Sequence, residues 1–168
     1  HDNNLEATRM TSPRRNFEDI SIGDEIPFLT KGPLISTHIM RWSAAMENWH
    51  RIHYDQVFAV EHDKLPGLLI NGSFKRNFLA QLLKDWVGHA GWAWKMNFQM
   101  RKMNVVGETL TIWGKVTGKN EAEHYGLVDL EIGIRNEHGL ESTPGTATVA
   151  LPYRKGPPVA YPFKPPAA

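Results

Sequence analysis

The sequence predicts a single α+β domain in which an antiparallel sheet wraps one long helix. The chain has 168 residues, which suits one domain with a sizeable core and no need for disulfides or structural metal. A wide apolar face with helical spacing spans residues 74–87. Short β-rich runs separated by turn residues fill residues 92–152. A helix-rich half followed by a strand-rich half is typical of this fold class.

Two helices are expected in the first half of the chain. Ser36 and Thr37 are suitable N-cap residues, and the apolar spacing that follows predicts a helix at about 37–47. The second helix begins after Asn71-Gly72 and closes at Gly88. Its apolar face consists of Phe74, Phe78, Leu79, Leu82, Leu83, Trp86 and Val87. We expect this face to pack on the sheet, with polar residues such as Lys75 on the opposite face.

The strands are expected at about 92–101, 108–118, 124–135 and 142–152, in an antiparallel meander. Turn residues lie between them, for example in Asn136-Glu137-His138-Gly139. Residues 1–16 are polar without an apolar period and are expected to form a mobile tail. Residues 153–168 are rich in proline and are expected to be extended. The folded domain is therefore predicted to span residues 17–152.

Composition excludes several classes of function. The net charge of +1 gives no reason to expect nucleic-acid binding. No apolar run is long enough for a transmembrane helix, so no membrane partner is expected. The absence of cysteine excludes disulfides, thiolate zinc sites and a cysteine nucleophile. It also fits a reducing compartment, and we expect a cytoplasmic protein.

Residues 48–55 form the first candidate segment, Asn-Trp-His-Arg-Ile-His-Tyr-Asp. His50 and His53 titrate near neutrality, which suits a proton carrier for adding or removing water. Two plainer interpretations stay open: Asp55 caps a short helix, and His50 is a solvated loop residue. A metal site is not expected, because no third imidazole lies nearby.

Residues 65–73, Leu-Pro-Gly-Leu-Leu-Ile-Asn-Gly-Ser, form the second candidate segment. If Gly72 opens the long helix, its free amide and the positive end of the helix dipole could bind an oxyanion. The carbonyl oxygen of a thioester gains negative charge when its α-carbon takes on enolate character. Asn71-Gly72 is equally compatible with an ordinary turn.

Together these segments resemble the MaoC-like hydratase/dehydratase family, which includes (R)-specific enoyl-CoA hydratases. His53-Tyr54-Asp55 is similar to the family's His-x-Asp motif, and Phe58-Ala59 to the pair that follows. Leu65-Pro66-Gly67 and Gly72 are similar to the approach to its central helix. Phe17–Asp24 is similar to its first strand and Gly145–Leu151 to its last, so the likeness covers residues 17–152.

The resemblance implies a hot-dog fold, in which an antiparallel sheet wraps a long central helix and two copies pair edge to edge. It implies that His53 acts as base and acid and that the Gly72 amide binds the thioester oxygen. Asn71 and Ser73 at the helix start, with His50, Arg51, Tyr54 and Asp55 in the loop, are expected to contact substrate. The substrate is expected to be an acyl-CoA or acyl-carrier thioester, with no cofactor beyond the CoA of the substrate.

The sequence departs from the family pattern at two positions. Asn48 stands where the family places an Asp, and Asn71 stands where it usually has His. An amide cannot accept a proton as a carboxylate does, although Asn48 can still hold a water. A subgroup similar to mesaconyl- and itaconyl-CoA hydratases shares the Asn-x-His-Arg-Ile-His-Tyr-Asp pattern.

Three functions therefore stay open. The leading one is reversible hydration of an enoyl thioester by a homodimer or higher homo-oligomer. The second is a non-catalytic partner in a heterodimer with another hot-dog subunit, which the two asparagines favour. The third is a hot-dog thioesterase using Glu47, the carboxylate nearest the motif loop besides Asp55. The phosphates of CoA would suit basic residues at the mouth of the pocket, where Lys75, Arg76, Arg101 and Lys102 are candidates.

Overall fold

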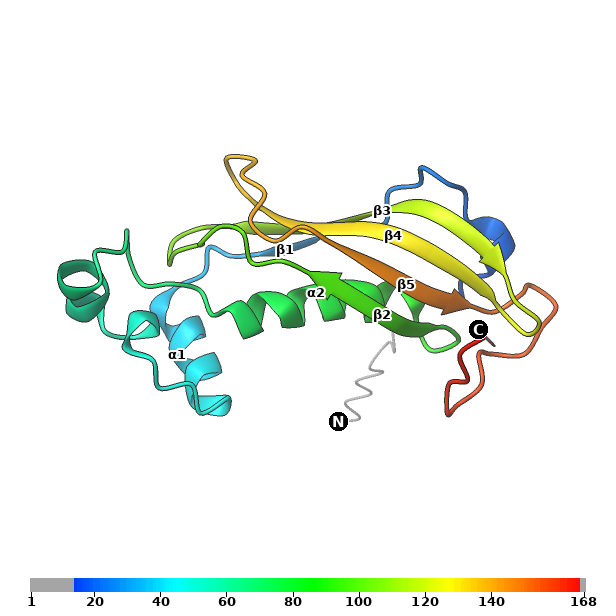
Figure 1. Cartoon of the computed structure of the whole chain (residues 1–168), viewed down its shortest axis with the longest axis horizontal. Helices are drawn as coiled ribbons and strands as arrows, with labels where there is room; N and C mark the ends of the chain where they lie inside the picture. The colour runs from blue at the N-terminus through cyan, green and yellow to red at the C-terminus, as the bar shows by residue number, and fades with distance from the viewer. Residues whose placement is uncertain (1–13, 167–168) are drawn as a thin grey trace, which may run out of the picture.

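The computed structural model describes residues 14–166. It contains a five-stranded antiparallel sheet in the order β1-β3-β4-β5-β2, with helix α2 along one face (Figure 1). The helices are α1 (Ser36–Ala45) and α2 (Gly72–Val87), and the strands are β1 (Leu29–Lys31), β2 (Trp92–Phe98), β3 (Leu110–Glu121), β4 (Gly126–Asn136) and β5 (Gly145–Leu151). The predicted α+β architecture, both helices and the four later strands are confirmed.

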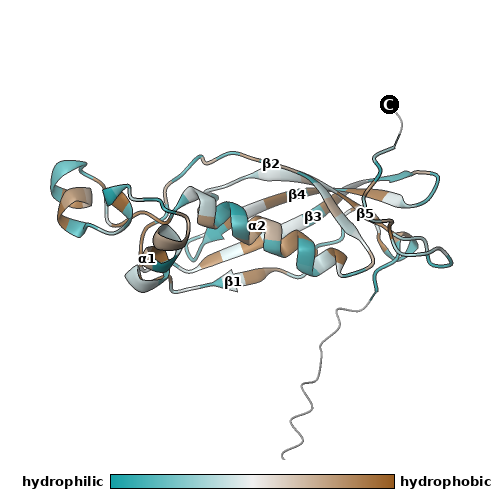
Figure 2. Ribbon diagram, turned by 90° about the horizontal axis from the view of Figure 1, so that it is seen from below, coloured by the Kyte–Doolittle hydropathy of each residue, from teal (hydrophilic) through white to brown (hydrophobic). Residues whose placement is uncertain are grey.

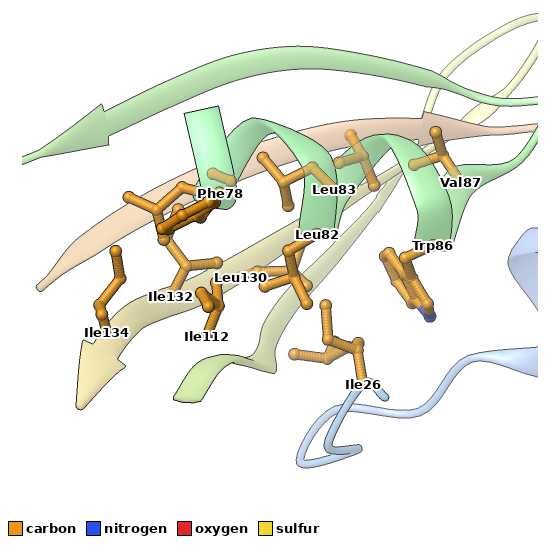
Figure 3. Close-up of a cluster of buried hydrophobic side chains, with 14 of the residues drawn as sticks. Ile26, Phe78, Leu82, Leu83, Trp86, Val87, Ile112, Leu130, Ile132 and Ile134 are labelled. Atoms are coloured by element: carbon orange, nitrogen blue, oxygen red, sulfur yellow. The ribbon is translucent and has the colours of Figure 1, made fainter. Parts of the chain in front are cut away.

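The core lies between α2 and the sheet. Leu82 of α2 lies beside Leu130 of β4, and Trp86 lies near Ile26, within one buried cluster that also contains Leu83 and Ile112 (Figure 3). The residues of α2 that face the sheet recur every three to four positions, which is the helical period. Figure 2 shows hydrophobic and hydrophilic residues alternating within the turns of α2, seen from the side away from the sheet. This packing fixes α2 rigidly, and with it the position of its first turn.

The segment Phe17–Asp24 is not a strand, contrary to prediction. Phe17–Asp19 forms a 3-10 helix, and the first strand of the sheet is β1, which pairs with β3. The reason is local turn chemistry. Asp24 Oδ2 accepts a hydrogen bond from the amide of Ser21 at 2.7 Å, and Gly23 has a φ of 97°. This tight turn interrupts any extended run, because a side chain that bonds the nearby backbone competes with sheet pairing.

Helix α1 begins at Ser36, one residue before its predicted start. Ile35 is the N-cap residue, and its amide donates to Nδ1 of His38 at 3.1 Å. Ser36 and Thr37 therefore lie in the first turn instead of capping it. The inward face of α1 carries Ile39 and Ser43, which are fully buried one turn apart.

Both ends of the described chain contact the domain. Residues 1–13 of the predicted N-terminal tail lie outside the described residues, but Arg15 donates to the carbonyl of Trp86 at 2.7 Å. After Pro152 the chain has no helix or strand up to residue 166. Phe163 packs there against Trp92 and Tyr125. Among the described residues, neither helix has the length and apolar character needed to span a bilayer.

Candidate active site

His53 is held in place by the backbone of a neighbouring segment. It ends a short 3-10 helix, Arg51–His53, and its side chain is 8% exposed. Its Nδ1 donates a hydrogen bond to the carbonyl of Leu69 at 2.9 Å. Since a carbonyl can only accept, Nδ1 carries the proton, and in the neutral ring Nε2 is left as an acceptor. Nε2, the ring nitrogen that is not bonded to Leu69, is therefore available to act as a base.

The surroundings of His53 favour this neutral form. Burial lowers the pKa of His53 below its usual value of 6.5, because the charged ring is poorly solvated there. The bond to the Leu69 carbonyl acts in the opposite direction, and the charge of His50 lowers the pKa further. The lowered pKa thus favours the neutral form of His53 at neutral pH, and that form can take a proton.

Gly72 is the first residue of α2, so the helix-start interpretation is right and the hairpin-turn interpretation is wrong. Asn71 is the N-cap residue, with φ −56° and ψ 133°. None of the hydrogen bonds found within residues 14–166 uses the Gly72 amide as donor. A Cβ at Gly72 would meet the Met100 side chain at 3.6 Å, so the space outside this backbone is shared with Met100. A free amide at the positive end of a 16-residue helix suits an anionic oxygen.

His53 and Gly72 line the same cavity, which has a volume of about 430 Å³. Its wall is part apolar and part basic, and it consists of His53, Leu69, Ile70, Gly72, Lys75, Met100, Arg101, Lys102 and Met103. No Asp or Glu side chain is among these described residues. A base, a free backbone donor and an apolar wall thus meet in one hollow, as an acyl thioester requires.

A larger hollow of about 570 Å³ lies under the C-terminal segment. Tyr125, Tyr153 and Phe163 form its wall together with several prolines. We place the candidate site in the smaller cavity, because that cavity joins a buried imidazole to a helix N-terminus. The residue types that line a cavity, and not its volume, are the basis for this choice between the two cavities.

Asn71 and Ser73 support the helix start from outside this cavity. Asn71 is fully buried and its Nδ2 donates to Oγ of Ser43 at 3.0 Å. Its Oδ1 has no hydrogen-bond partner among the described residues. Oγ of Ser73 accepts a hydrogen bond from the Trp42 indole at 2.8 Å. Neither side chain lines the cavity of this chain, although both were predicted to contact substrate.

The remaining loop residues also lie outside the cavity lining. Asn48 is half-buried, and its Oδ1 accepts from the backbone amide of His50 at 3.4 Å. The His50 ring is exposed, with its centre 6.1 Å from that of His53. Tyr54 donates to the carbonyl of Trp49. Glu47, the carboxylate of the thioesterase hypothesis, is exposed and does not line the cavity either.

Asp55 has a structural role, as the plainer interpretation held. Its Oδ1 accepts the amide of Phe58 at 3.0 Å and so caps the helical turns that follow. Its Oδ2 pairs with Arg51 at 2.7 Å. These hydrogen bonds, with that to Phe58 the largest influence, lower the pKa of the Asp55 carboxyl. The loop is thereby fixed around the short helix that carries His53.

The prediction that Lys75 lies on the polar face of its helix is wrong. Its side chain is only 3% exposed and lines the cavity. Burial lowers its pKa to about 8, against the opposing charge of Glu108. The sequence held a signal for this position, because Lys75 precedes Phe78, Leu79 and Leu82 by three, four and seven residues. That spacing places the lysine on the buried face.

A family model described as hydroxyacyl-thioester dehydratase type 2 matches residues 7–108, which is more than half of the chain. The chain belongs to this family. Membership supports the general dehydratase and hydratase chemistry that the cavity suggests, and it agrees with the MaoC-like resemblance. A comparison with curated proteins found no match.

Solved structures of similar shape establish the hot-dog fold. The (R)-hydratase from A. caviae involved in PHA biosynthesis has 20% identity and a TM-score of 0.71, covering 80% of this chain and 99% of that one. A MaoC-like dehydratase from Rhodospirillum rubrum has 17% identity and a TM-score of 0.72, covering 83% and 98%. The ChsH1-ChsH2 complex from Mycobacterium tuberculosis has 19% identity and a TM-score of 0.68, covering 78% and 98%.

Proposed function

We propose that this hot-dog dehydratase interconverts enoyl and 3-hydroxyacyl thioesters at the cavity of His53 and Gly72. The observation that carries the proposal is that a buried imidazole, whose Nδ1 is bonded to the Leu69 carbonyl, and a free helix-start amide line one cavity. In the hydration direction, Nε2 of His53 takes a proton from water while the hydroxyl adds to the β-carbon. The Gly72 amide stabilises the negative charge on the thioester oxygen. The imidazolium then returns the proton to the α-carbon, which balances the step.

The carrier is proposed to be CoA or an acyl-carrier protein. Arg101 and Lys102 are exposed residues of the cavity wall, and cations at such a place suit the phosphates of either carrier. The subgroup resemblance adds acyl groups with a second carboxylate to the candidates. No cofactor is proposed beyond the carrier, and we expect a cytoplasmic enzyme that forms a homodimer or higher homo-oligomer.

The direct test is a hydration assay on a panel of enoyl-CoA esters, including one with a second carboxylate. The readout is loss of the conjugated thioester absorbance. His53→Ala is expected to lower kcat by about 10²–10⁴-fold, the usual contribution of a general base. His89→Ala is the matched control, because this histidine is exposed and lies outside the cavity wall. Equal rates for His53→Ala and the unchanged protein would end the assignment.

A second candidate is the role of a partner subunit. Asn48 lies outside the cavity lining and Asn71 replaces the usual histidine, so another hot-dog chain could supply the missing group. The structural neighbour from Mycobacterium tuberculosis is itself a complex of two components, ChsH1 and ChsH2. Purification of the protein from its source decides this point. A second hot-dog chain that stays bound favours the partner role, and a homo-oligomer with hydratase activity contradicts it.

A further inference from the structure

A largely buried polar cluster adjoins the cavity through Lys75 and is not used by the proposed chemistry. It comprises Lys75 of α2 with Asn104 and Glu108 of the segment between β2 and β3. Nζ of Lys75 donates to Oδ1 of Asn104 at 3.0 Å and to the carbonyl of Lys102 at 3.1 Å. Nδ2 of Asn104 donates to Oε2 of Glu108 at 2.6 Å. Lys75 is 3% and Asn104 1% exposed, while Glu108 is half-buried, so the bond between Lys75 and Asn104 is largely shielded from bulk water.

The cluster fixes the segment that in turn holds His53. The Ile70 amide donates to the carbonyl of Asn104 at 2.9 Å, and Leu69 forms an antiparallel bridge with Val105. The Leu69 amide donates to the carbonyl of Ile52 at 3.0 Å, and the Leu69 carbonyl accepts from His53. Residues 68–70 are therefore clamped between the loop of His53 on one side and residues 104–106 on the other.

We propose that Lys75 is a positioning residue, which holds residues 102–105 against α2 and thereby sets the His53 ring relative to the Gly72 amide. The inference rests on the proposed function for its kinetic consequences. Lys75 and Gly72 are three residues apart on one helix, so the lysine ties the segment behind the base to the helix that carries the oxyanion donor. Burying an ammonium is costly unless its donors are used, and both recorded bonds go to this one segment.

The donors of Lys75, and not its charge, carry the role. A neutral amine keeps two N–H bonds, which is the number the two acceptors require. The charged or titratable groups around it are Glu108 on the adjoining segment and His53, Arg101 and Lys102 on the cavity wall. The positioning effect is therefore expected to persist when Lys75 loses its proton. If Lys75 acted through its charge, its effect would instead decrease as the pH rises through its pKa of about 8.

The test is Lys75→Met, which keeps an unbranched side chain of similar length and removes its donors. The substrate is an enoyl-CoA that the unchanged protein hydrates. The kcat of Lys75→Met is expected to be about tenfold lower or more, while its KM changes less than threefold. The His53 imidazole nitrogen signals in NMR are expected to shift or broaden. Lys84→Met on the exposed face of the same helix is the control, and it should change neither readout.

Each other outcome has a definite meaning. An unchanged kcat, or a rise in KM alone, overturns the proposal, and the second result points to a direct contact with an anionic substrate. If Lys75→Met does not fold, Glu108→Gln is measured in its place. A loss of kcat smaller than tenfold supports the proposal, and an unchanged kcat contradicts it. If the unchanged protein hydrates no enoyl thioester, the proposed function fails. The NMR comparison then still tests whether Lys75 positions His53.

Discussion

The two ends of α2 serve different purposes. From Phe78 to Val87 the buried face of the helix is apolar and packs on the sheet (Figure 3). The first turn instead carries a free amide at Gly72 and a buried amine at Lys75, both on the wall of a cavity. The apolar end anchors the helix rigidly, so that the polar end can hold groups that are costly to bury. Stability and chemistry are therefore expected to respond separately to substitutions at the two ends.

The largest change in the free energy of unfolding is expected at the apolar end of α2. Leu82→Ala should lower the free energy of unfolding by about 2–5 kcal/mol, because it leaves a cavity at a side chain that is 1% exposed. The kcat of the remaining folded protein should change little. Urea unfolding against Lys84→Ala, an exposed neighbour, measures the effect. A full loss of kcat without loss of stability would contradict the division between the two ends.

At the polar end we expect a loss of kcat with little change in stability. Gly72→Pro removes the amide donor at a position where helices accept proline. The extended backbone of Asn71, with ψ 133°, is compatible with a following proline. We expect kcat to fall about 10²–10³-fold with little change in unfolding free energy.

Gly72→Ala is the partner variant, because it keeps the amide and adds a methyl group at ordinary contact distance from Met100. Its kcat should stay within about tenfold of the unchanged protein, since the oxyanion donor remains. If both variants lose activity equally, space at the helix start matters and its donor does not.

The pH dependence sharpens the comparison further. Because burial lowers the pKa of His53 below 6.5, kcat/KM should fall about tenfold per pH unit only below that value. The unfolded chain binds more protons than the folded one between the folded-state pKa and 6.5. The unfolding free energy should therefore decrease as pH falls through this window and level off below it. His53→Gln should remove this component, as paired urea titrations would reveal; an unchanged pH slope would argue against it.

The smallest effect is expected at Asn48. Since its side chain lies outside the cavity lining of this chain, Asn48→Ala should lower kcat only a few-fold, far less than His53→Ala. Steady-state kinetics of the two variants in one assay provide the measurement. A loss comparable to that of His53→Ala would show that Asn48 reaches the reacting water in the assembled protein.

Features governed by short-range rules were predictable from the sequence. The spacing of Phe78, Leu82 and Trp86 predicted α2, and the glycines at 72 and 88 marked its ends. The family resemblance, and not a short-range rule, implied that His53 and Gly72 meet, and both residues line one cavity. Their catalytic roles stay predictions. Local turn chemistry at Ser21–Asp24 was also present in the sequence, although the likeness to a strand obscured it.

The sequence by itself determined the α+β class, the long helix and the residue types available for chemistry, because periodicity and turn preferences act over a few residues. The tertiary structure alone decided which residues cover Lys75 and that Asn48 lies apart from the cavity wall. Lys75 is covered by Lys102 and Asn104, which follow it by more than 25 residues. Burial and pKa depend on which distant segments meet, and no local pattern encodes that meeting.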